Sequence, residues 1–170
     1  MNNSRRTFIK QSTVAVAGTA FLPKILLKEK SGDMLGLQLY TVRDNMKTDP
    51  ADTLKRVADI GYKYVEHAGY RDRKFYGYSI ADFKKLLMDT GLKMDSGHSF
   101  FGAEQWNKST NDVTDEWKQT VEDAIAVGMK YIISPGVDES LCKNMEDFKR
   151  YVDMFNKTGA FCKKSGIQFA

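Results

Sequence analysis

Side chains with strong hydrogen-bonding capacity stand where predicted strands of this chain end. An amide, a phenol, a carboxylate and an imidazole can each bind a hydroxyl group of a ligand. An imidazole can in addition transfer a proton or bind a metal ion. These candidate binding residues are Gln38, Tyr40, Glu66 and His98.

Each of these side chains also has a structural interpretation. Gln38 and Tyr40 could fill the interior of a closed sheet, and Glu66 could form a structural salt bridge. A lone histidine is more often structural, but His98 ends its strand, where functional residues of α/β barrels gather. His67 falls on the opposite face of its strand, so we expect it to pack against a helix or lie at the rim.

Two further candidates lie beyond the strand ends. Arg43 could bind a carboxylate or a phosphate, or it could cap a helix start on the surface. Trp106 lies with Phe100 and Phe101 in a long polar loop over residues 99–113. These aromatic rings could form a wall of a binding pocket, or they could anchor the loop.

Alternating strands and helices position these residues. Leucines alternate with other residues over 35–40, which is the period of a pleated strand, and a β-rich segment follows each helix. Helix-start signals precede three of the helices: Asp49 with Pro50, Ser79 with Asp82, and Asn144 with Asp147. The predicted strands cover residues 35–40, 62–68, 92–98, 130–134 and 167–170.

Apolar residues recur at helical spacing between these strands, which predicts helices with one buried face. His98 shares a strand face with Met94 and Ser96 by simple alternation, and the charged run at residues 71–74 is expected to be a solvated loop. The residues expected to face inward from the helices are Leu54, Val57, Ala58, Phe83, Leu86, Leu87, Trp117, Val121, Ala124, Ile125, Phe148, Tyr151, Val152 and Phe155.

A glycine joint repeats along the chain, which indicates repeated βα units. Each joint has a glycine that ends a helix, one apolar residue, one polar residue and then a strand. Alternating units of this length predict a parallel sheet, as an open doubly wound sheet or a (β/α)8 barrel. The first strand lacks the glycine-rich loop of dinucleotide-binding proteins. The joints stand at Gly61, Gly91, Gly128 and Gly166.

Several of these segments resemble the sugar phosphate isomerase/epimerase family, the xylose isomerase-like TIM barrels, and exported bacterial members in particular. The first strand motif, residues 36–44 (GLQLYTVRD), is the most specific part, and residues 49–54, 60–66 and 91–98 add to it. The resemblance covers residues 34–170. It implies an α/β fold of the (β/α)8 TIM-barrel type, with the first four βα units and the start of strand five present here.

The same resemblance implies a function. Members of the family use a divalent metal ion (Mn, Mg, Co or Zn) and isomerise or epimerise a small-molecule sugar through an enediolate. Their metal ligands, two Glu, an Asp and a His, stand at the ends of later strands, and the two Glu also act as the acid–base pair. We therefore expect the substrate-binding residues in this chain and none of the catalytic or metal-binding residues.

The chain is too short for a complete barrel, and two interpretations follow from this. A barrel of this type takes about 250 residues, whereas Met34 to Ala170 comprise 137. The leading hypothesis is the N-terminal half of a metal-dependent sugar isomerase or epimerase. The alternative is a non-catalytic periplasmic module, either a sugar-binding half-barrel or a half that assembles with a second one.

The N-terminus predicts export. Residues 4–10 (SRRTFIK) resemble a twin-arginine signal, and a weakly apolar stretch with small residues follows to residue 22. We expect residues 1–33 to be a signal peptide and linker, and the location to be the periplasm. A basic amphipathic helix of the folded protein is the alternative.

Charge argues against nucleic acid as a partner. The formal net charge is +4, but residues 1–30 hold six basic residues and one acidic residue, so the remainder is nearly neutral. An abasic-site endonuclease of the same barrel superfamily fits this balance poorly. We expect no membrane association after signal removal, and the sequence leaves a homo-oligomer open.

The two cysteines are not expected to form a disulfide. Cys142 and Cys162 bracket a predicted helix, and ends 20 residues apart lie roughly 30 Å from each other at helical rise. A disulfide requires Cα atoms within about 7 Å. We therefore expect two small side chains that are free thiols.

Overall fold

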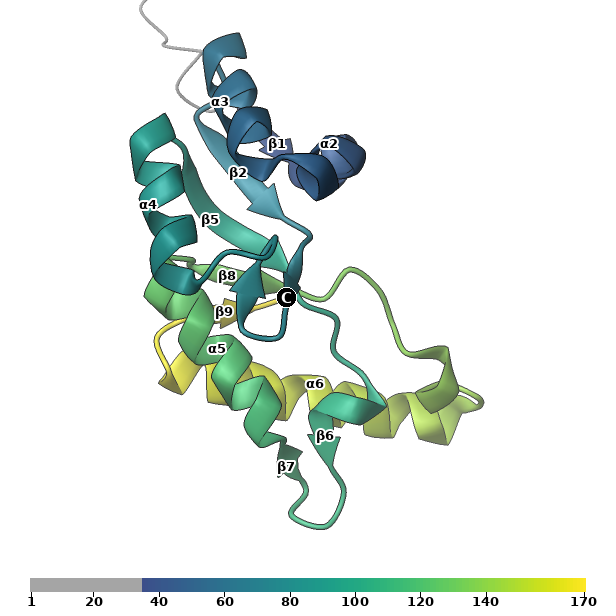
Figure 1. Ribbon diagram of the computed structural model, residues 1–170. Coiled ribbons are helices and arrows are strands. Elements are labelled where there is room, and N and C mark those ends of the chain that lie inside the picture. Colours follow the sequence, from purple (N-terminus) through teal and green to yellow (C-terminus); the bar gives the residue numbers. More distant parts are fainter. Residues whose placement is uncertain (1–34) are drawn as a thin grey trace, which may run out of the picture. The chain divides into compact units, whose positions relative to one another are not determined.

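The structure is a computed structural model that describes residues 35–170 (Figure 1). The predicted signal peptide and linker over residues 1–33 lie outside the described residues. No helix within 35–170 is long and apolar enough to cross a membrane.

Five parallel strands form the central sheet, in the order β1-β2-β5-β8-β9. Each of the five predicted strands is present, and each is shorter than the segment expected for it. The sheet therefore follows the order of the chain, as the repeated βα units require. The strands are β1 (Gly36–Gln38), β2 (Tyr64–His67), β5 (Lys93–His98), β8 (Tyr131–Ile133) and β9 (Gln168–Phe169).

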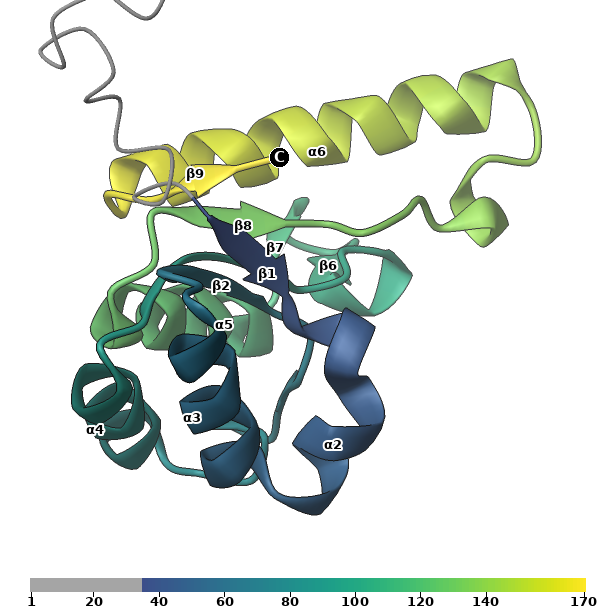
Figure 2. The same ribbon diagram turned by 90° about the horizontal axis from the view of Figure 1, so that it is seen from above.

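Helices follow the strands and lie along one side of the curved sheet (Figures 1 and 2). The fold is that of a TIM barrel in which the described strands form a partial, unclosed barrel with β1 and β9 at its two edges. This confirms the predicted barrel-type α/β class. The helices are α2 (Arg43–Thr48), α3 (Pro50–Ile60), α4 (Ile80–Thr90), α5 (Asp115–Val127) and α6 (Met145–Lys164).

The predicted helix ends are confirmed at α3 and α4. Asp49 accepts a hydrogen bond from the Asp52 amide at 3.0 Å and Pro50 opens α3, while Ser79 caps α4. Gly61 and Gly91 close these helices with φ of +114° and +70°. Residues other than glycine rarely adopt this backbone conformation, so the glycine joints mark real helix ends.

The core lies between the helices and one face of the sheet, and it departs from the expected helix faces at three positions. Ile125 is 40% exposed, Phe148 45% and Val152 41%, so their predicted inward orientation is wrong. On α5 the buried stripe instead runs through Trp117, Val121, Ala124 and Val127, and on α6 it runs through Tyr151, Thr158 and Cys162. The three apolar residues flank these stripes.

The loop after β2 contains a short hairpin, β3 (Tyr70–Arg71) and β4 (Lys74–Phe75). Arg71, Arg73 and Lys74 are exposed, as expected for a solvated charge run. Arg73 in addition donates to the buried Asp123 of α5 at 3.0 Å, and Tyr70 donates to the same carboxylate at 2.7 Å, which the sequence did not predict. Burial of the carboxyl opposes the effect, but these hydrogen bonds hold the pKa of Asp123 below its usual value.

The loop after β5 is also ordered into short elements: the turn η3 (Ala103–Gln105) and the hairpin of β6 (Trp106–Asn107) and β7 (Asp112–Val113). The cysteines are free, as expected. Cys162 is fully buried, and this burial raises the pKa of its thiol to about 11. Its thiol is therefore an inert part of the core.

Candidate functional site

Four polar side chains meet at the carboxyl ends of three neighbouring strands. Gln38 of β1 lies opposite Glu66 of β2, and Glu66 lies opposite Ser96 of β5, with His98 two residues further along β5. They lie on the sheet face opposite the helix-packed core, and the side chains of Glu66 and His98 are 27% and 28% exposed. The sheet thus brings together three of the residues that the sequence singled out.

Hydrogen bonds join these side chains into one unit, here named the Gln38–His98–Glu66 network. Nε2 of Gln38 lies 3.2 Å from Nδ1 of His98, and Nε2 of His98 lies 3.1 Å from Oε1 of Glu66. Ser96 donates its hydroxyl to Oε2 of Glu66 at 2.6 Å. Both carboxylate oxygens and both ring nitrogens therefore have partners.

The network selects one tautomer of His98. The backbone amide of Tyr40 donates to Oε1 of Gln38, which turns the Gln38 amide nitrogen toward the imidazole. An amide nitrogen is a donor only, so Nδ1 of His98 must accept, and the ring proton resides on Nε2. From there it is donated to Glu66. A ligand hydroxyl can exchange with either of these hydrogen bonds.

A β-bulge in β5 decides which of its side chains join the network. Tyr64 pairs with Lys93 and Glu66 with Ser96, so β5 holds one residue more than β2 between these points. Met94 consequently lies in the core at 4% exposure, whereas Ser96 and His98 lie on the opposite face. The expectation that Met94 shares their face is wrong, because the extra residue shifts the alternation.

A hollow of about 630 Å³ opens at this network. Two exposed aromatic rings line it, Tyr40 at 60% exposure and Phe100 at 47%. A second hollow of about 410 Å³ continues along the inner face and shares Gln38 with the first. The first hollow is lined by Gln38, Tyr40, Thr41, Ala68, His98, Phe100 and Pro135.

Tyr40 and Arg43 lie just past the first strand. Strand β1 ends at Gln38 because the Gln38 side chain caps a following turn of 3-10 helix, η2 (Leu39–Val42). Arg43 donates to the Tyr40 carbonyl at 3.2 Å, and its guanidinium lies 4.8 Å from the centre of the Tyr40 ring. Arg43 therefore holds Tyr40 and does not line the hollow.

Of the three aromatic residues predicted in the long loop, the structure brings only Phe100 to the network. Phe101 is fully buried and packs against Trp117, with ring centres 5.1 Å apart. Trp106 is 7% exposed and lines a different hollow, of about 830 Å³, beside α6. The structure thus does not bring Trp106 together with Gln38, Glu66 and His98, and its substrate-binding role stays a prediction.

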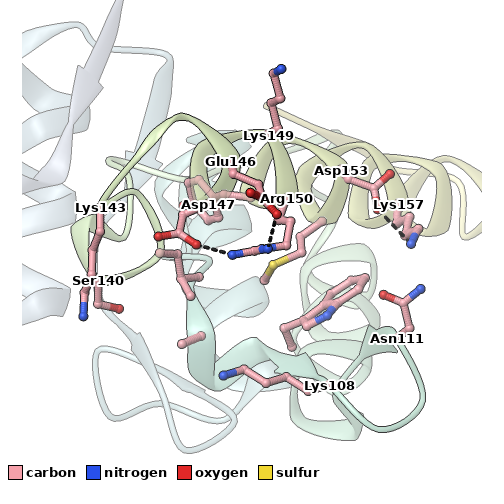
Figure 3. A pocket seen from close by; sticks show the side chains of 15 residues that line it. Lys108, Asn111, Ser140, Lys143, Glu146, Asp147, Lys149, Arg150, Asp153 and Lys157 are labelled. Atoms are coloured by element: carbon pink, nitrogen blue, oxygen red, sulfur yellow. Dashed lines mark hydrogen bonds and ion pairs between the residues drawn. The ribbon is translucent and has the colours of Figure 1, made fainter.

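The hollow at Trp106 is larger than the two hollows at the strand ends, but its charged groups already neutralise one another in part. Figure 3 shows Arg150 between Glu146 and Asp147, and Lys157 beside Asp153. Arg150 lies 3.0 Å from Glu146, and Lys157 lies 2.8 Å from Asp153. The smaller hollow at the strand ends is the better candidate site, because its hydrogen-bonding groups converge from three strands.

The described residues do not fit a divalent metal site by themselves. Glu66 and His98 could ligate a metal, but every ligating atom they have is already hydrogen-bonded within the network. Within residues 35–170, no group of three or more His, Cys, Asp or Glu side chains could hold a metal ion. Catalytic metals usually take about three protein ligands.

Residues of the site that sequence reasoning missed are Ser96, Thr41, Ala68 and Pro135. Ser96 had a signal, because it stands two residues before His98 on the same strand. Ala68 had a similar signal, because it stands two residues after Glu66 in the same predicted strand. Thr41 and Pro135 had none, and they line the hollow because of where their loops lie in space. Such positions depend on contacts between distant loops.

Together these features define a partial β/α barrel with its candidate site at the carboxyl ends of the strands. The sequence profile of the xylose isomerase-like TIM barrel matches residues 54–170. The chain belongs to this family, which includes sugar isomerases and epimerases.

Solved structures agree with this assignment. A sugar phosphate isomerase/epimerase from Parabacteroides distasonis is 26% identical with a TM-score of 0.68, over 84% of this chain and 51% of the other. A second protein of that description from the same organism is 30% identical with a TM-score of 0.65, over 79% and 52%. A D-psicose 3-epimerase shares the fold at 17% identity and a TM-score of 0.52, over 79% and 50%.

The chain spans about half the length of these solved structures. A search of the curated proteins found no match.

Proposed function

We propose that this chain is the substrate-binding part of a sugar isomerase or epimerase. The observation that carries the proposal is the Gln38–His98–Glu66 network, which stands at the carboxyl ends of three adjacent barrel strands. Functional residues of β/α barrels stand at this edge. Family membership supports a sugar as the ligand.

The residues of the network would bind and orient the sugar. The Gln38 amide can donate, the Glu66 carboxylate can accept, and His98 can do either at its two nitrogens. A sugar hydroxyl is both donor and acceptor, so it can replace one partner in each of these hydrogen bonds without leaving a polar group unpaired. The exposed rings of Tyr40 and Phe100 would contact the apolar face of the sugar.

The reaction we propose for the whole protein is aldose–ketose isomerisation or epimerisation through an enediolate, with a divalent metal. A metal would stabilise negative charge on the oxygens of the enediolate. Because the described residues do not form its site, their proposed role is confined to binding and orientation. We also propose export to the periplasm: replacing Arg5 and Arg6 by lysine should leave the protein in the cytoplasmic fraction, and unchanged export would contradict this.

The test is sugar binding by the 170-residue chain, measured by calorimetry or NMR, with solvent deuterium exchange measured in parallel on the whole protein with and without Mn²⁺. We expect saturable binding that Glu66→Gln weakens about tenfold, the typical cost of losing a charged hydrogen bond. Lys85→Gln is a matched control, since Lys85 is an exposed residue on α4. Binding by the chain with exchange by the whole protein supports the isomerase proposal, binding without exchange by the whole protein supports the sugar-binding module, and no saturable binding contradicts both.

A further inference from the structure

The hollow at the Gln38–His98–Glu66 network has no positive charge of its own. None of the seven residues of 35–170 that line it is a lysine or an arginine. The nearest charged group of the network is the Glu66 carboxylate, 3.1 Å from the His98 ring. The adjoining hollow adds the carboxylates of Glu66 and Asp95, and Asp95 is paired with Lys130 at 2.8 Å.

Arg43 is the cation closest in sequence to the residues that line the hollow, but its side chain is held at Tyr40. Its guanidinium lies over the Tyr40 ring and donates to the Tyr40 carbonyl. Both contacts hold the guanidinium at Tyr40, and Arg43 is not among the described residues that line the hollow. Arg43 therefore supports the Tyr40 ring, and the Tyr40 ring lines the hollow.

The lining suits an uncharged, hydroxyl-rich molecule. Two aromatic rings, Tyr40 and Phe100, provide apolar surface, while Gln38 and His98 provide a small number of oriented polar atoms. Pockets for neutral ligands combine surfaces in this way. A phosphate ester carries a charge of about −1.5 to −2 near neutral pH and would lie beside Glu66, where no residue of 35–170 that lines the first hollow is a cation.

We propose that this site takes the free, unphosphorylated sugar and discriminates against its phosphate ester. The inference rests on the proposed function and sharpens it, because it names the substrate class of the same site. Like charges brought together at a binding site oppose association, whereas the hydroxyl contacts are the same for both forms. The discrimination is therefore electrostatic and should weaken as salt is added.

The experiment compares D-fructose, D-ribulose and D-xylulose, each beside its terminal phosphate ester, for binding to the full chain. We expect at least one free sugar to bind about tenfold or more tightly than its ester. Equal or tighter binding of the esters would overturn this inference and leave the proposed function standing. No binding of either form would overturn the proposed function itself.

Two variants that each add one lysine test whether charge causes the preference for the free sugar. Thr41→Lys places a cation at the hollow on an exposed residue, and Met88→Lys makes a matched change on α4 at a position 72% exposed. Thr41→Lys should tighten ester binding about tenfold while Met88→Lys leaves it unchanged. If the two variants bind the ester alike, charge at the hollow does not set the preference for the free sugar, and the inference fails.

Discussion

The two histidines of this chain stand near the ends of neighbouring strands and have opposite environments. His67 of β2 is 1% exposed and packs edge-on against Phe75, with ring centres 4.8 Å apart. Burial, and next the proximity of His98, lower its pKa to about 3. His98 of β5 lies on the other face, where both of its ring nitrogens are paired.

The difference shows that strand position alone does not make a functional histidine. Nδ1 of His67 is buried and has no hydrogen-bond partner among residues 35–170, so the ring is packed as an apolar body at the cost of one unpaired nitrogen. Nδ1 of His98 is bound by a side chain from another strand. The face of the sheet, set by the alternation of side chains, separates the packed ring of His67 from the ring of His98 at the candidate site.

One added methyl group tests whether the His67 ring is tightly packed. A Cβ added at Gly97 would lie 1.8 Å from Cδ2 of His67. We expect Gly97→Ala to lower the free energy of unfolding by about 3 kcal/mol, the upper part of the range for overpacking. Urea denaturation measures the effect.

A double variant identifies the cause of that loss. If the clash with the imidazole is responsible, adding His67→Ala to Gly97→Ala should cost less than the two single losses combined. Additive losses would show that Gly97 is needed for some other reason, and the account of His67 as a packed ring would fail.

The same burial makes stability depend on pH. The folded-state pKa of His67 lies below its unfolded value, so the unfolded chain binds the extra proton, and stability is complete above the unfolded value and falls as pH drops toward 3. Between pH 6.5 and 4.5 this loss should reach about 2 kcal/mol. Denaturant midpoints across that range measure it.

His67→Leu should remove this part of the pH dependence, because leucine does not titrate. His98→Gln should retain it, since His98 lies on the other face. Equal slopes in the wild type and in His67→Leu over this range would contradict the assignment.

Changing His98 should have the opposite effect, with a large loss of sugar affinity and a small loss of stability. His98→Ala removes one partner from both Gln38 and Glu66, so sugar affinity should fall about tenfold while stability changes by less than about 1 kcal/mol. His67→Leu is the matched control and should alter affinity by less than about twofold, since it makes no contact with the hollow. Calorimetric titration with the best-binding sugar separates the two outcomes.

The smallest effect is expected at Arg43. Arg43→Gln removes the cation over Tyr40 and should weaken sugar binding by about fivefold or less, because exposed cation–π contacts contribute about 0.5–1 kcal/mol. A loss as large as that of His98→Ala would mean that Arg43 contacts the ligand, contrary to its place in the structure.

Local signals predicted most of the fold. Glycine joints such as Gly61 and Gly91 mark helix ends through a backbone conformation that other residues avoid, so they could be read without tertiary information. The repeat of these joints predicted the parallel sheet. The sequence placed Gln38, Glu66 and His98 each at the end of a predicted strand, and the structure brings the three side chains together.

Features that depend on distant contacts could not be predicted. The bulge that moves Met94 into the core is visible only when β5 is paired with β2. The hydrogen bond from Arg73 to Asp123 joins residues 50 positions apart, and the sequence gives no sign that this arginine differs from its charged neighbours. The separation of Phe100 from Phe101 and Trp106 likewise depends on how the loop packs.

The most direct test of the account follows the two imidazole rings by NMR while a free ketose is added. The chain has two histidines, so two ring signals can be assigned with the variants His67→Leu and His98→Gln. Saturable shifts at His98 with none at His67 are the predicted result. Shifts at His67, or no shift at His98 while the sugar binds, would contradict the assignment of the site to the Gln38–His98–Glu66 network.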